Sequence, residues 1–493
     1  MSSATAAPAA PPAEQFRIAS ILGPLAAIVM GAFMAILDNT IVNVAFPTLQ
    51  TVFKANLDLM QWVITGYLLA QAAVIPLSGW LSDRYGAKPL YIVALVLFTA
   101  GSIACAAAPT AEMLVAFRVL QGLGGGMILP IGMAFVYRLA PPEHRGRVMG
   151  ALGIPILLGP ALGPIISGWL VEYADWRLIF LINVPVGIVA VFVAFRALPS
   201  MEAQQTPGPL DTVGAIFGPL AFAALSYGIS RSSADTWTGK TTLLGIGIGL
   251  VALAIFVVRE LRTDHPLLEL RVFRSIDFSL TILTQWIIFA VLMGALFLLP
   301  LFLQQVRHYG AFDTGLYLLP NALTAAVFMP IGGILFDRLG IRVPALLGIV
   351  LVVASTFFLT RISGSTTGTD FLPILAVMGA GLGLMMMPLN THLLGVAPRD
   401  LVSRVTSLST ALQNVVASLA IAGLATILQN RVSEHMPARN GAGAHNPLVV
   451  LNAAAHGFAD TMLVAFILGI IAILLVMTLR PRPAEGVEAL PMA

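Results

Sequence analysis

Two charged residues, Asp38 and Arg118, lie deep within long apolar stretches of this sequence. Asp38 precedes Pro47 by nine residues, near the outer end of the first stretch. Arg118 follows Pro109 by nine residues, near the outer start of the fourth. At a helical rise of 1.5 Å per residue, both charges are about 13 Å below the same surface of a membrane. A charge at that depth is costly and marks a functional site by default.

The chemistry open to this pair is reversible protonation. Burial favours the neutral form of a carboxyl group, whereas a nearby guanidinium favours the carboxylate, so substrate or helix motion can switch a group held between them. We therefore expect Asp38 to bind the proton and Arg118 to modulate it, in a shared water-filled cavity. The alternative is a permanent ion pair that only orders this part of the chain. The sequence contains a repeat at an offset of 254 residues, described below, and the residue at that offset from Asp38 is Leu292. Because leucine cannot bind a proton, titration is expected in the first half alone.

A second pattern with chemical meaning occurs twice. Residues 76–88 read PLSGWLSDRYGAK and residues 330–342 read PIGGILFDRLGIR, a repeat at a constant offset of 254. Acid–base pairs at the inner ends of helices hold neighbouring elements together, so we expect a gate here. A topology anchor is the alternative. The residues of the expected gate are Gly79, Asp83, Arg84, Gly86 and Lys88 in the first copy, and Asp337 and Arg338 in the second. Gly79 is expected to permit close helix contact, and Asp83 to pair with a base such as Lys88 or Arg145.

The segment 153–168, GIPILLGPALGPIISG, is dense in glycine and proline. Proline removes backbone hydrogen bonds and permits bending, and glycine permits close helix packing. The motif that we single out is Gly159, Pro160 and Gly163. Ordinary tight packing is the alternative interpretation.

Polar and aromatic side chains within the apolar stretches are the candidates for a substrate cavity. Apolar walls with a few polar groups suit lipophilic ligands. For His392 a structural role is the alternative to a proton relay. The candidates are Asn39, Asn43, Trp62, Tyr67, Gln71, Gln121, Gln285, Trp286, Asn321, Asn390 and His392.

The composition requires a membrane around these residues. Of the 493 residues, 58% are hydrophobic and 10% are charged, whereas soluble domains are about 45–50% apolar and about 25% charged. This excludes a soluble enzyme, a disordered chain and a disulfide scaffold, and the single cysteine, Cys105, cannot form an internal disulfide. A net charge of +3 is too small for a nucleic-acid partner. No pattern indicates a metal site or a cofactor.

Long apolar segments predict an all-α polytopic membrane protein, because a spanning helix needs about 20 apolar residues. Two of the segments, 212–230 and 241–259, are diluted by Gly and Ser, and without them the number of spans is twelve. The fourteen predicted spans are 18–48, 57–81, 88–108, 111–138, 146–171, 177–198, 212–230, 241–259, 276–304, 312–336, 342–361, 371–396, 401–429 and 457–479.

The repeat and the spans together predict the domain organisation. Both copies of the repeat lie on an inner loop between two spans, so two six-helix bundles are related as a parallel repeat. Most of the 26 Lys and Arg residues lie on the side of the N-terminus, which places both termini in the cytoplasm. The predicted parts are a tail at 1–16, a bundle at 17–198, a linker with two extra spans at 199–271, a bundle at 272–480 and a tail at 481–493.

Five segments in order give the sequence a family resemblance: LDNTIVNVAFP at 37–47, GWLSDRYGAK at 79–88, FRVLQGLGGG at 117–126, GIPILLGPALGP at 153–164 and DWRLIFLINVPVG at 175–187. The chain resembles the major facilitator superfamily, and specifically its fourteen-span drug:proton antiporter branch. The resemblance implies a major-facilitator fold and a monomer in a bacterial-type inner membrane. It also implies that the 79–88 motif stabilises an outward-open state. The Gly159-Pro160-Gly163 element is associated with exporters, although Pro164 and Ile165 depart from the family pattern.

We therefore expect a proton-driven exporter of lipophilic, cationic small molecules. Its partners are the small-molecule substrate, protons and membrane lipid. An exporter of a lipid, lysolipid or endogenous metabolite, an importer or facilitator, and a membrane enzyme or scaffold are the alternatives.

Overall fold

The computed structural model describes residues 22–139, 159, 162–200, 209–235, 237–264, 266–396, 402–436 and 447–479. Within this part of the chain all regular secondary structure is helical, and thirteen helices are long and apolar enough to cross a membrane. The all-α prediction is therefore confirmed. Each of these helices corresponds to a predicted span. The remaining prediction, 146–171, lies largely outside the described residues, and its described end is helical from 162 to 173.

The first half of the chain begins with the long helix that carries Asp38. Its helices are α1 (Leu22–Phe53), α2 (Leu57–Met60), α3 (Trp62–Tyr85), α4 (Ala87–Ala106), α5 (Ala111–Leu139), α7 (Leu178–Leu181) and α8 (Asn183–Ala197), with the helical segment 162–173 before α7.

The inserted pair and the second half follow in the predicted order. The inserted hairpin is α9 (Thr212–Asp235) and α10 (Lys240–Arg262). The second half contains η3 (Leu270–Arg274), α11 (Ile276–Leu301), η4 (Phe302–Val306), α12 (Ala311–Leu339), α13 (Arg342–Leu359), η5 (Gly368–Asp370), α14 (Phe371–Val396), α15 (Val402–His435) and α16 (Pro447–Thr478).

The repeat is visible in the backbone of the two halves. Gly86 ends α3 with φ 87°, and Gly340 ends α12 with φ 74°. Each N–H donates to a carbonyl one turn back, that of Ser82 at 2.9 Å and that of Phe336 at 2.8 Å. Glycine is suited to both turns because a side chain is strained at positive φ. We call the end of the bundle with these two turns the inner end and the opposite end the outer end.

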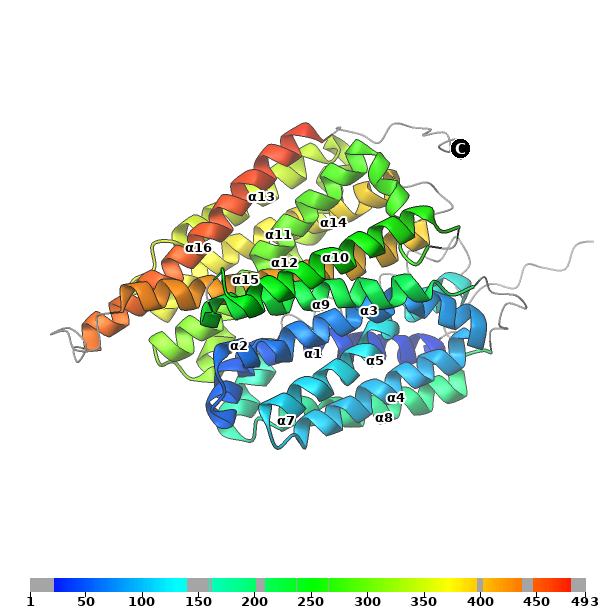
Figure 1. Cartoon of the computed structure of the whole chain (residues 1–493), viewed down its shortest axis with the longest axis horizontal. Coiled ribbons are helices and arrows are strands. Elements are labelled where there is room, and N and C mark those ends of the chain that lie inside the picture. Colours follow the sequence, from blue (N-terminus) through cyan, green and yellow to red (C-terminus); the bar gives the residue numbers. More distant parts are fainter. Residues whose placement is uncertain are drawn as a thin grey trace, which may run out of the picture.

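The inserted hairpin lies along the seam between the halves. Figure 1 shows α9 and α10 crossing the middle of the molecule, between α1, α4, α5 and α8 on one side and α11, α13, α14 and α16 on the other. The helix α9 packs against α3 of the first half and α15 of the second. Gln61 donates to the hydroxyl of Ser230, and Thr426 donates to the carbonyl of Ile229 at 3.2 Å. The hairpin is therefore attached to both halves.

The glycines that weaken the hairpin's hydropathy explain how its helices pack. A Cβ added at Gly245 would lie 2.7 Å from the Cα of Gly228. Only glycine at these positions lets the backbones of α9 and α10 approach this closely. The face of α10 that points away from the bundle is apolar, and its side chains Leu244, Ile248 and Val251 are exposed about one turn apart. Such a stripe is suited to lipid contact.

The halves contact each other at the outer end. Gln304 donates to the carbonyl of Val44 at 2.9 Å, and the N–H of Phe312 donates to Glu172 at 2.7 Å. Gln305 donates to Gln50 at 2.9 Å. These bonds join α1 and the segment 162–173 to η4 and α12.

Candidate functional site

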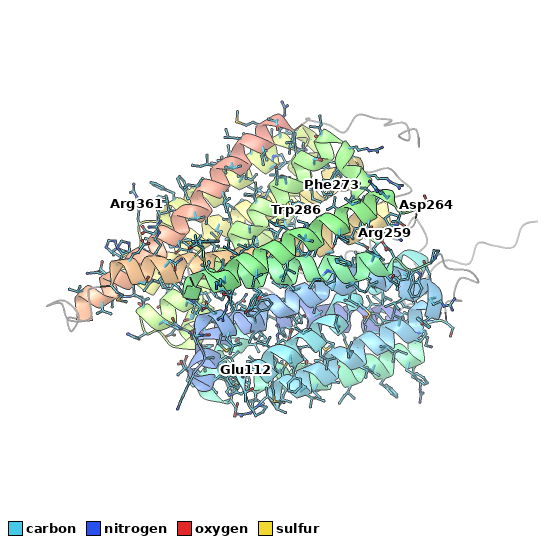
Figure 2. The ribbon with its side chains drawn as sticks, in the orientation of Figure 1. Glu112, Arg259, Asp264, Phe273, Trp286 and Arg361 are labelled. Atoms are coloured by element: carbon cyan, nitrogen blue, oxygen red, sulfur yellow. The ribbon has the colours of Figure 1, made fainter. Side chains whose placement is uncertain are left out.

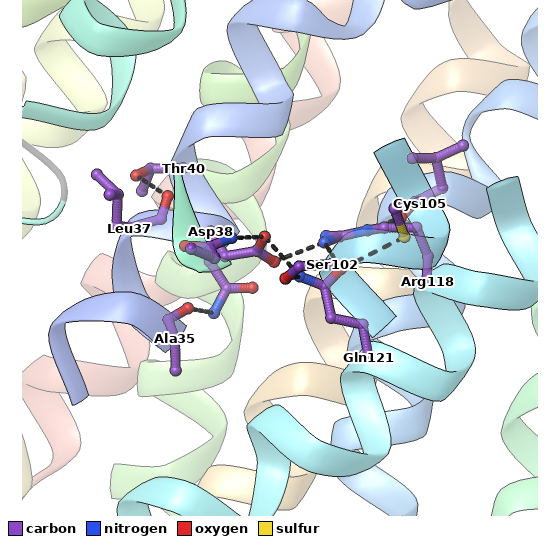
Figure 3. Close-up of polar contacts among 11 residues, drawn as sticks. Ala35, Leu37, Asp38, Thr40, Ser102, Cys105, Arg118 and Gln121 are labelled. Atoms are coloured by element: carbon purple, nitrogen blue, oxygen red, sulfur yellow. Dashed lines mark hydrogen bonds and ion pairs between the residues drawn. The ribbon is translucent and has the colours of Figure 1, made fainter. Parts of the chain in front are cut away.

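Asp38 is fully buried on α1 and accepts three hydrogen bonds, as Figure 3 shows in part. Arg118 donates from Nη1 to Oδ2 at 2.5 Å, and Gln121 donates from Nε2 to Oδ1 at 2.9 Å. Asn183 also donates to Oδ1, at 3.1 Å. A buried carboxylate with three donors, one of which is a guanidinium, is electrically balanced, which makes its burial tolerable.

Arg118 is held as tightly as its partner. Its Nε donates to the carbonyl of Val63 at 3.0 Å, and its Nη1 also donates to the side-chain oxygen of Gln121 at 2.7 Å. The Cζ atom lies 3.9 Å from the ring centroid of Tyr67, a cation–π distance. The side chain is 1% exposed. The guanidinium is therefore positioned by α3 as well as by Asp38.

Gln121 connects the ion pair to α4. Its Nε2 donates to the hydroxyl of Ser102 at 2.7 Å, and the thiol of Cys105 lies 3.6 Å from its Oε1. The polar network thus joins α1, α3, α4, α5 and α8 in the core of the first half. A change of charge at Asp38 acts on all five helices.

The glycine-rich run after Arg118 brings α5 close to its neighbours. A Cβ at Gly122 would lie 2.6 Å from the carbonyl oxygen of Tyr67, and one at Gly124 would lie 2.5 Å from the backbone nitrogen of Phe98. These positions place α5 in direct backbone contact with α3 and α4. Because Arg118 lies one turn before Gly122 on α5 and Gln121 directly precedes Gly122, the same packing sets their depth.

The sequence predicts a shared water-filled cavity around Asp38 and Arg118, whereas the structure shows both side chains buried. Asp38 and Arg118 lie in contact with each other, and neither is open to solvent in this structure. Protonating the carboxylate would leave the guanidinium without its counter-charge. A buried charge whose partner is removed is strongly destabilising.

The glycine–proline segment packs on the turn of α1 that carries Asp38. The hydroxyl of Thr40 donates to the carbonyl of Gly159 at 3.3 Å, and Ser167 donates to the carbonyl of Ile41 at 2.5 Å. A Cβ at Gly163 would collide with Thr40. Pro160 lies outside the described residues.

The other side of the same segment contacts the second half. Gly168 lies against the backbone of Ala311, and Gly315 lies against the carbonyl of Pro164, each too close for a Cβ. The segment therefore lies between the Asp38 turn and α12.

The gate residues lie at the inner end. Asp83 and Lys88 are half-buried, whereas Gly79, Arg84, Asp337 and Arg338 are exposed. The ammonium of Lys88 lies 5.9 Å from the ring centroid of Phe195. Among the described residues no atom lies within 4 Å of a Cβ built at Gly79, and the close contact predicted there stays a prediction. Arg145 lies outside the described residues.

The predicted cavity residues separate into different environments. Tyr67 and Gln121 belong to the Asp38 network. Gln71 accepts from Asn414 of the second half at 3.2 Å, and Gln285 donates to Asn390 at 3.0 Å. Of these, Asn390 is exposed at the inner half of α14.

The remaining candidates pack locally. Asn39 donates to the carbonyl of Ala35 on its own helix at 3.3 Å, and Asn321 donates to the carbonyl of Leu375 at 3.4 Å. His392 is buried 3.4 Å from Asp277. Trp62 and Asn43 are half-buried, and the ring of Trp286 lies 6.0 Å from that of Phe273.

Asn183 is a functional candidate that the sequence analysis does not identify. It is 2% exposed and contacts Asp38, and Ser102 joins the same network through Gln121. A lone amide in the apolar run LIFLINVPVG was the available signal. Its target was not visible, because α8 and α1 are far apart in the chain.

In the part of the chain that the structure describes, thirteen helices are long and apolar enough to span a membrane, eleven in the two repeated halves and two in the inserted hairpin. They define a multi-pass integral membrane protein of transporter architecture. Residues 28–421 match the Major Facilitator Superfamily, and the chain belongs to that family of transporters. It is therefore a transporter and not an enzyme.

Named relatives and a solved structure agree with this assignment. The chain is 38% identical over 411 residues to an uncharacterized MFS-type transporter, YhcA, of Bacillus subtilis, covering 83% of this chain and 77% of the relative. It is 37% identical over 406 residues to a multidrug resistance protein B homolog of Mycobacterium tuberculosis, covering 81% and 75%. A bacterial homolog of the human lysosomal transporter Spinster, solved inward-facing, has the same fold with a TM-score of 0.65 at 17% identity, covering 96% and 100%.

Proposed function

We propose that this protein is a proton-coupled antiporter that exports lipophilic, cationic small molecules by alternating access. The family membership supports transport, and the relative named for multidrug resistance supports drug efflux. The observation that carries proton coupling is the buried contact of 2.5 Å between Asp38 and Arg118.

In this proposal Asp38 takes up the proton and Arg118 sets how readily it does so. Protonation removes the negative charge that Arg118, Gln121 and Asn183 share. The guanidinium then needs another counter-charge or water, so helices of the first half move apart from their present packing. With one acid in the network, one proton is coupled through this site in each cycle.

The segment 159–168 would carry this change to the second half. It contacts the Asp38 turn through Thr40 and Ile41, and it contacts α12 through Ala311 and Gly315. A shift of the Asp38 turn therefore alters the outer contact between the halves. This is the step that would open one side and close the other.

The present arrangement is consistent with a state closed at the outer end. Gln304, Gln305 and Phe312 bond to the first half there, whereas Asn390 and Met387 are exposed toward the inner end. We propose that substrate enters from the inner side between the halves. A cation is favoured as cargo because it and the proton then compete for the same negative charge.

The proposal also assigns roles to the inner-end motifs, the surrounding lipid and the two bundles. The 79–88 motif and its copy at Asp337 and Arg338 act as the gate that stabilises the outward-open state. The protein works as a monomer surrounded by lipid in the bacterial inner membrane, with both termini in the cytoplasm. The bundles at 17–198 and 272–480 rock about the centre, and 199–271 contributes the inserted hairpin.

Everted membrane vesicles test the proposal. Asp38→Asn is expected to abolish proton-driven accumulation of a cationic dye such as ethidium, while the folded protein remains in the membrane. Asp175→Asn changes an exposed carboxylate near the outer end and is expected to transport like the wild type. Normal accumulation by Asp38→Asn would overturn the proposal.

A further inference from the structure

A second buried acid lies in the inserted hairpin. Glu260 is fully buried in the last turn of α10. Its Oε2 accepts from the backbone N–H of Leu268 at 3.1 Å, and its Oε1 is buried without a hydrogen-bond partner among the described residues. Figure 2 labels the neighbouring Arg259 and Asp264 at the end of the bundle opposite Glu112. Glu260 therefore lies at the inner end, far from Asp38.

A second carboxyl group points at the same space. Asp211, directly before α9, has a side chain that is 1% exposed, and its Oδ2 is also buried without a partner. A Cβ built at Gly214 would lie 2.5 Å from Oε1 of Glu260 and 2.8 Å from Oδ2 of Asp211. The two unpartnered oxygens thus converge above Gly214, where any side chain would displace them.

The charges around the pair do not balance two carboxylates. Arg259 donates from Nε to Oδ1 of Asp211 at 3.0 Å, and this bond neutralises Asp211. The other acid acting on Glu260 is Glu269 of the following linker. Of the bases on η3, Arg271 donates to the carbonyl of Thr263, and Arg274 is exposed.

The helices that surround the hairpin at this level contribute apolar side chains. A small apolar pocket one turn further into the membrane is lined by residues of α3, α9, α10 and α15. Gly218 and Phe256, each one turn from Gly214 and Glu260, lie on its wall, as does Leu268. No charged group lines this pocket. Among the described residues, apolar packing covers this side of Glu260, and no ion pair joins its carboxyl group to a cation.

From this geometry we propose that Glu260 and Asp211 form a second proton-binding site, in which one proton is shared between the two carboxyl groups. Two buried carboxyls that face each other cannot both be ionised without a large cost. Glu260 holds the proton and donates its O–H to Oδ2 of Asp211, which stays ionised through Arg259. Both unpartnered oxygens are then satisfied. On deprotonation the O–H bond of Glu260 breaks and the proton passes to water at the inner end.

Because of its position, ionisation of this site would affect the packing of the inserted hairpin. The backbone N–H of Leu268 donates a hydrogen bond to Glu260, and Leu268 also lines the apolar pocket between α3, α9, α10 and α15. An ionised Glu260 at the end of α10 would repel Asp211 at the start of α9, so the inner ends of these two helices would separate. The site therefore couples pH on that side to the docking of α9 and α10 along the seam.

Infrared difference spectroscopy between acidic and alkaline buffer tests the site directly on the purified protein. The wild type is expected to show the carbonyl stretch of a protonated carboxylic acid that is absent from Glu260→Gln. Glutamine keeps the shape of the protonated acid and can donate to Asp211, so this variant is expected to fold. The control Glu434→Gln removes an exposed carboxylate and is expected to leave that band unchanged.

Thermal unfolding against pH gives a second readout. A proton bound in the folded state and lost in the unfolded state makes stability fall as pH rises, by about tenfold in the unfolding equilibrium constant per pH unit at most. Glu260→Gln is expected to remove this part of the slope. A spectrum and a slope identical to those of the wild type would overturn the proposal. Glu260→Gln is also expected to retain dye export, so failure here is distinguishable from failure of coupling at Asp38.

Discussion

The hydroxyl of Thr40 donates a hydrogen bond to the carbonyl oxygen of Gly159, 3.3 Å away. Thr40 lies two residues after Asp38 on α1, and Gly159 belongs to the glycine–proline segment whose other side contacts α12. The proposed proton site and the contact between the halves are therefore connected through few atoms. This connection is what the proposed coupling needs.

Removing the base from the buried pair should cost more than removing both charges. Arg118→Met leaves the carboxylate of Asp38 buried without its counter-charge, and we expect a loss of about 3–5 kcal/mol in unfolding free energy. The double variant Asp38→Asn, Arg118→Met should recover most of that stability but should not couple transport to protons. Thermal unfolding in detergent measures both. Equal losses in the two proteins would show that the ion pair is not balanced as described.

The glycine run on α5 should be intolerant of any side chain. Gly124→Ala places a Cβ 2.5 Å from the backbone nitrogen of Phe98, and we expect a loss of about 1–3 kcal/mol through overpacking. Gly247→Ala on α10 is the matched control, because no described atom lies within 4 Å of its added Cβ. The control should be neutral or slightly stabilising, since alanine favours helix. Unfolding temperatures of the two variants check this, and equal temperatures would contradict the close packing.

The two inner-end turns should respond alike to substitution. Gly86→Ala and Gly340→Ala each force a residue with a Cβ to adopt positive φ, at a cost of about 1–2 kcal/mol. Similar losses in thermal stability would support equivalent turns in the two halves. A large loss at one position with none at the other would be inconsistent with the repeat.

Alternating access predicts that fixing the outer contact blocks transport. Gln50 and Gln305 are hydrogen-bonded across the halves, so the pair Gln50→Cys with Gln305→Cys should be joined by a short, reducible thiol cross-linker. The native Cys105 is buried and should not compete. We expect export to stop after cross-linking and to return after reduction. Unchanged export by the cross-linked protein would show that this contact does not open.

Much of this architecture could be predicted from the sequence, because a membrane makes hydropathy and charge strong signals. The depths of Asp38 and Arg118 predicted that they could meet, and the offset of 254 residues predicted the matching turns at Gly86 and Gly340. Segment boundaries were less accurate. The helix α16 begins at Pro447 and not near 457, because Asn452 and His456 reduce the hydropathy of its first turns.

The sequence could not predict which side chains from distant helices contact each other, because those contacts depend on helix packing. Asn183 joins Asp38, and Asp211 joins Glu260, only because distant helices are adjacent. Glu260 falls near the end of a predicted span, where carboxylates are usually solvated, so the sequence gives no signal of its burial. The linker at Leu268 folds back over it and buries it.

Proton release on substrate binding tests the central claim most directly. Ethidium is added to purified protein in weakly buffered detergent solution, and the pH change is recorded for the wild type, Asp38→Asn and the control Asp175→Asn. The account predicts release of about one proton per bound dye from the wild type and the control, and none from Asp38→Asn. Equal release from Asp38→Asn and the wild type would contradict it.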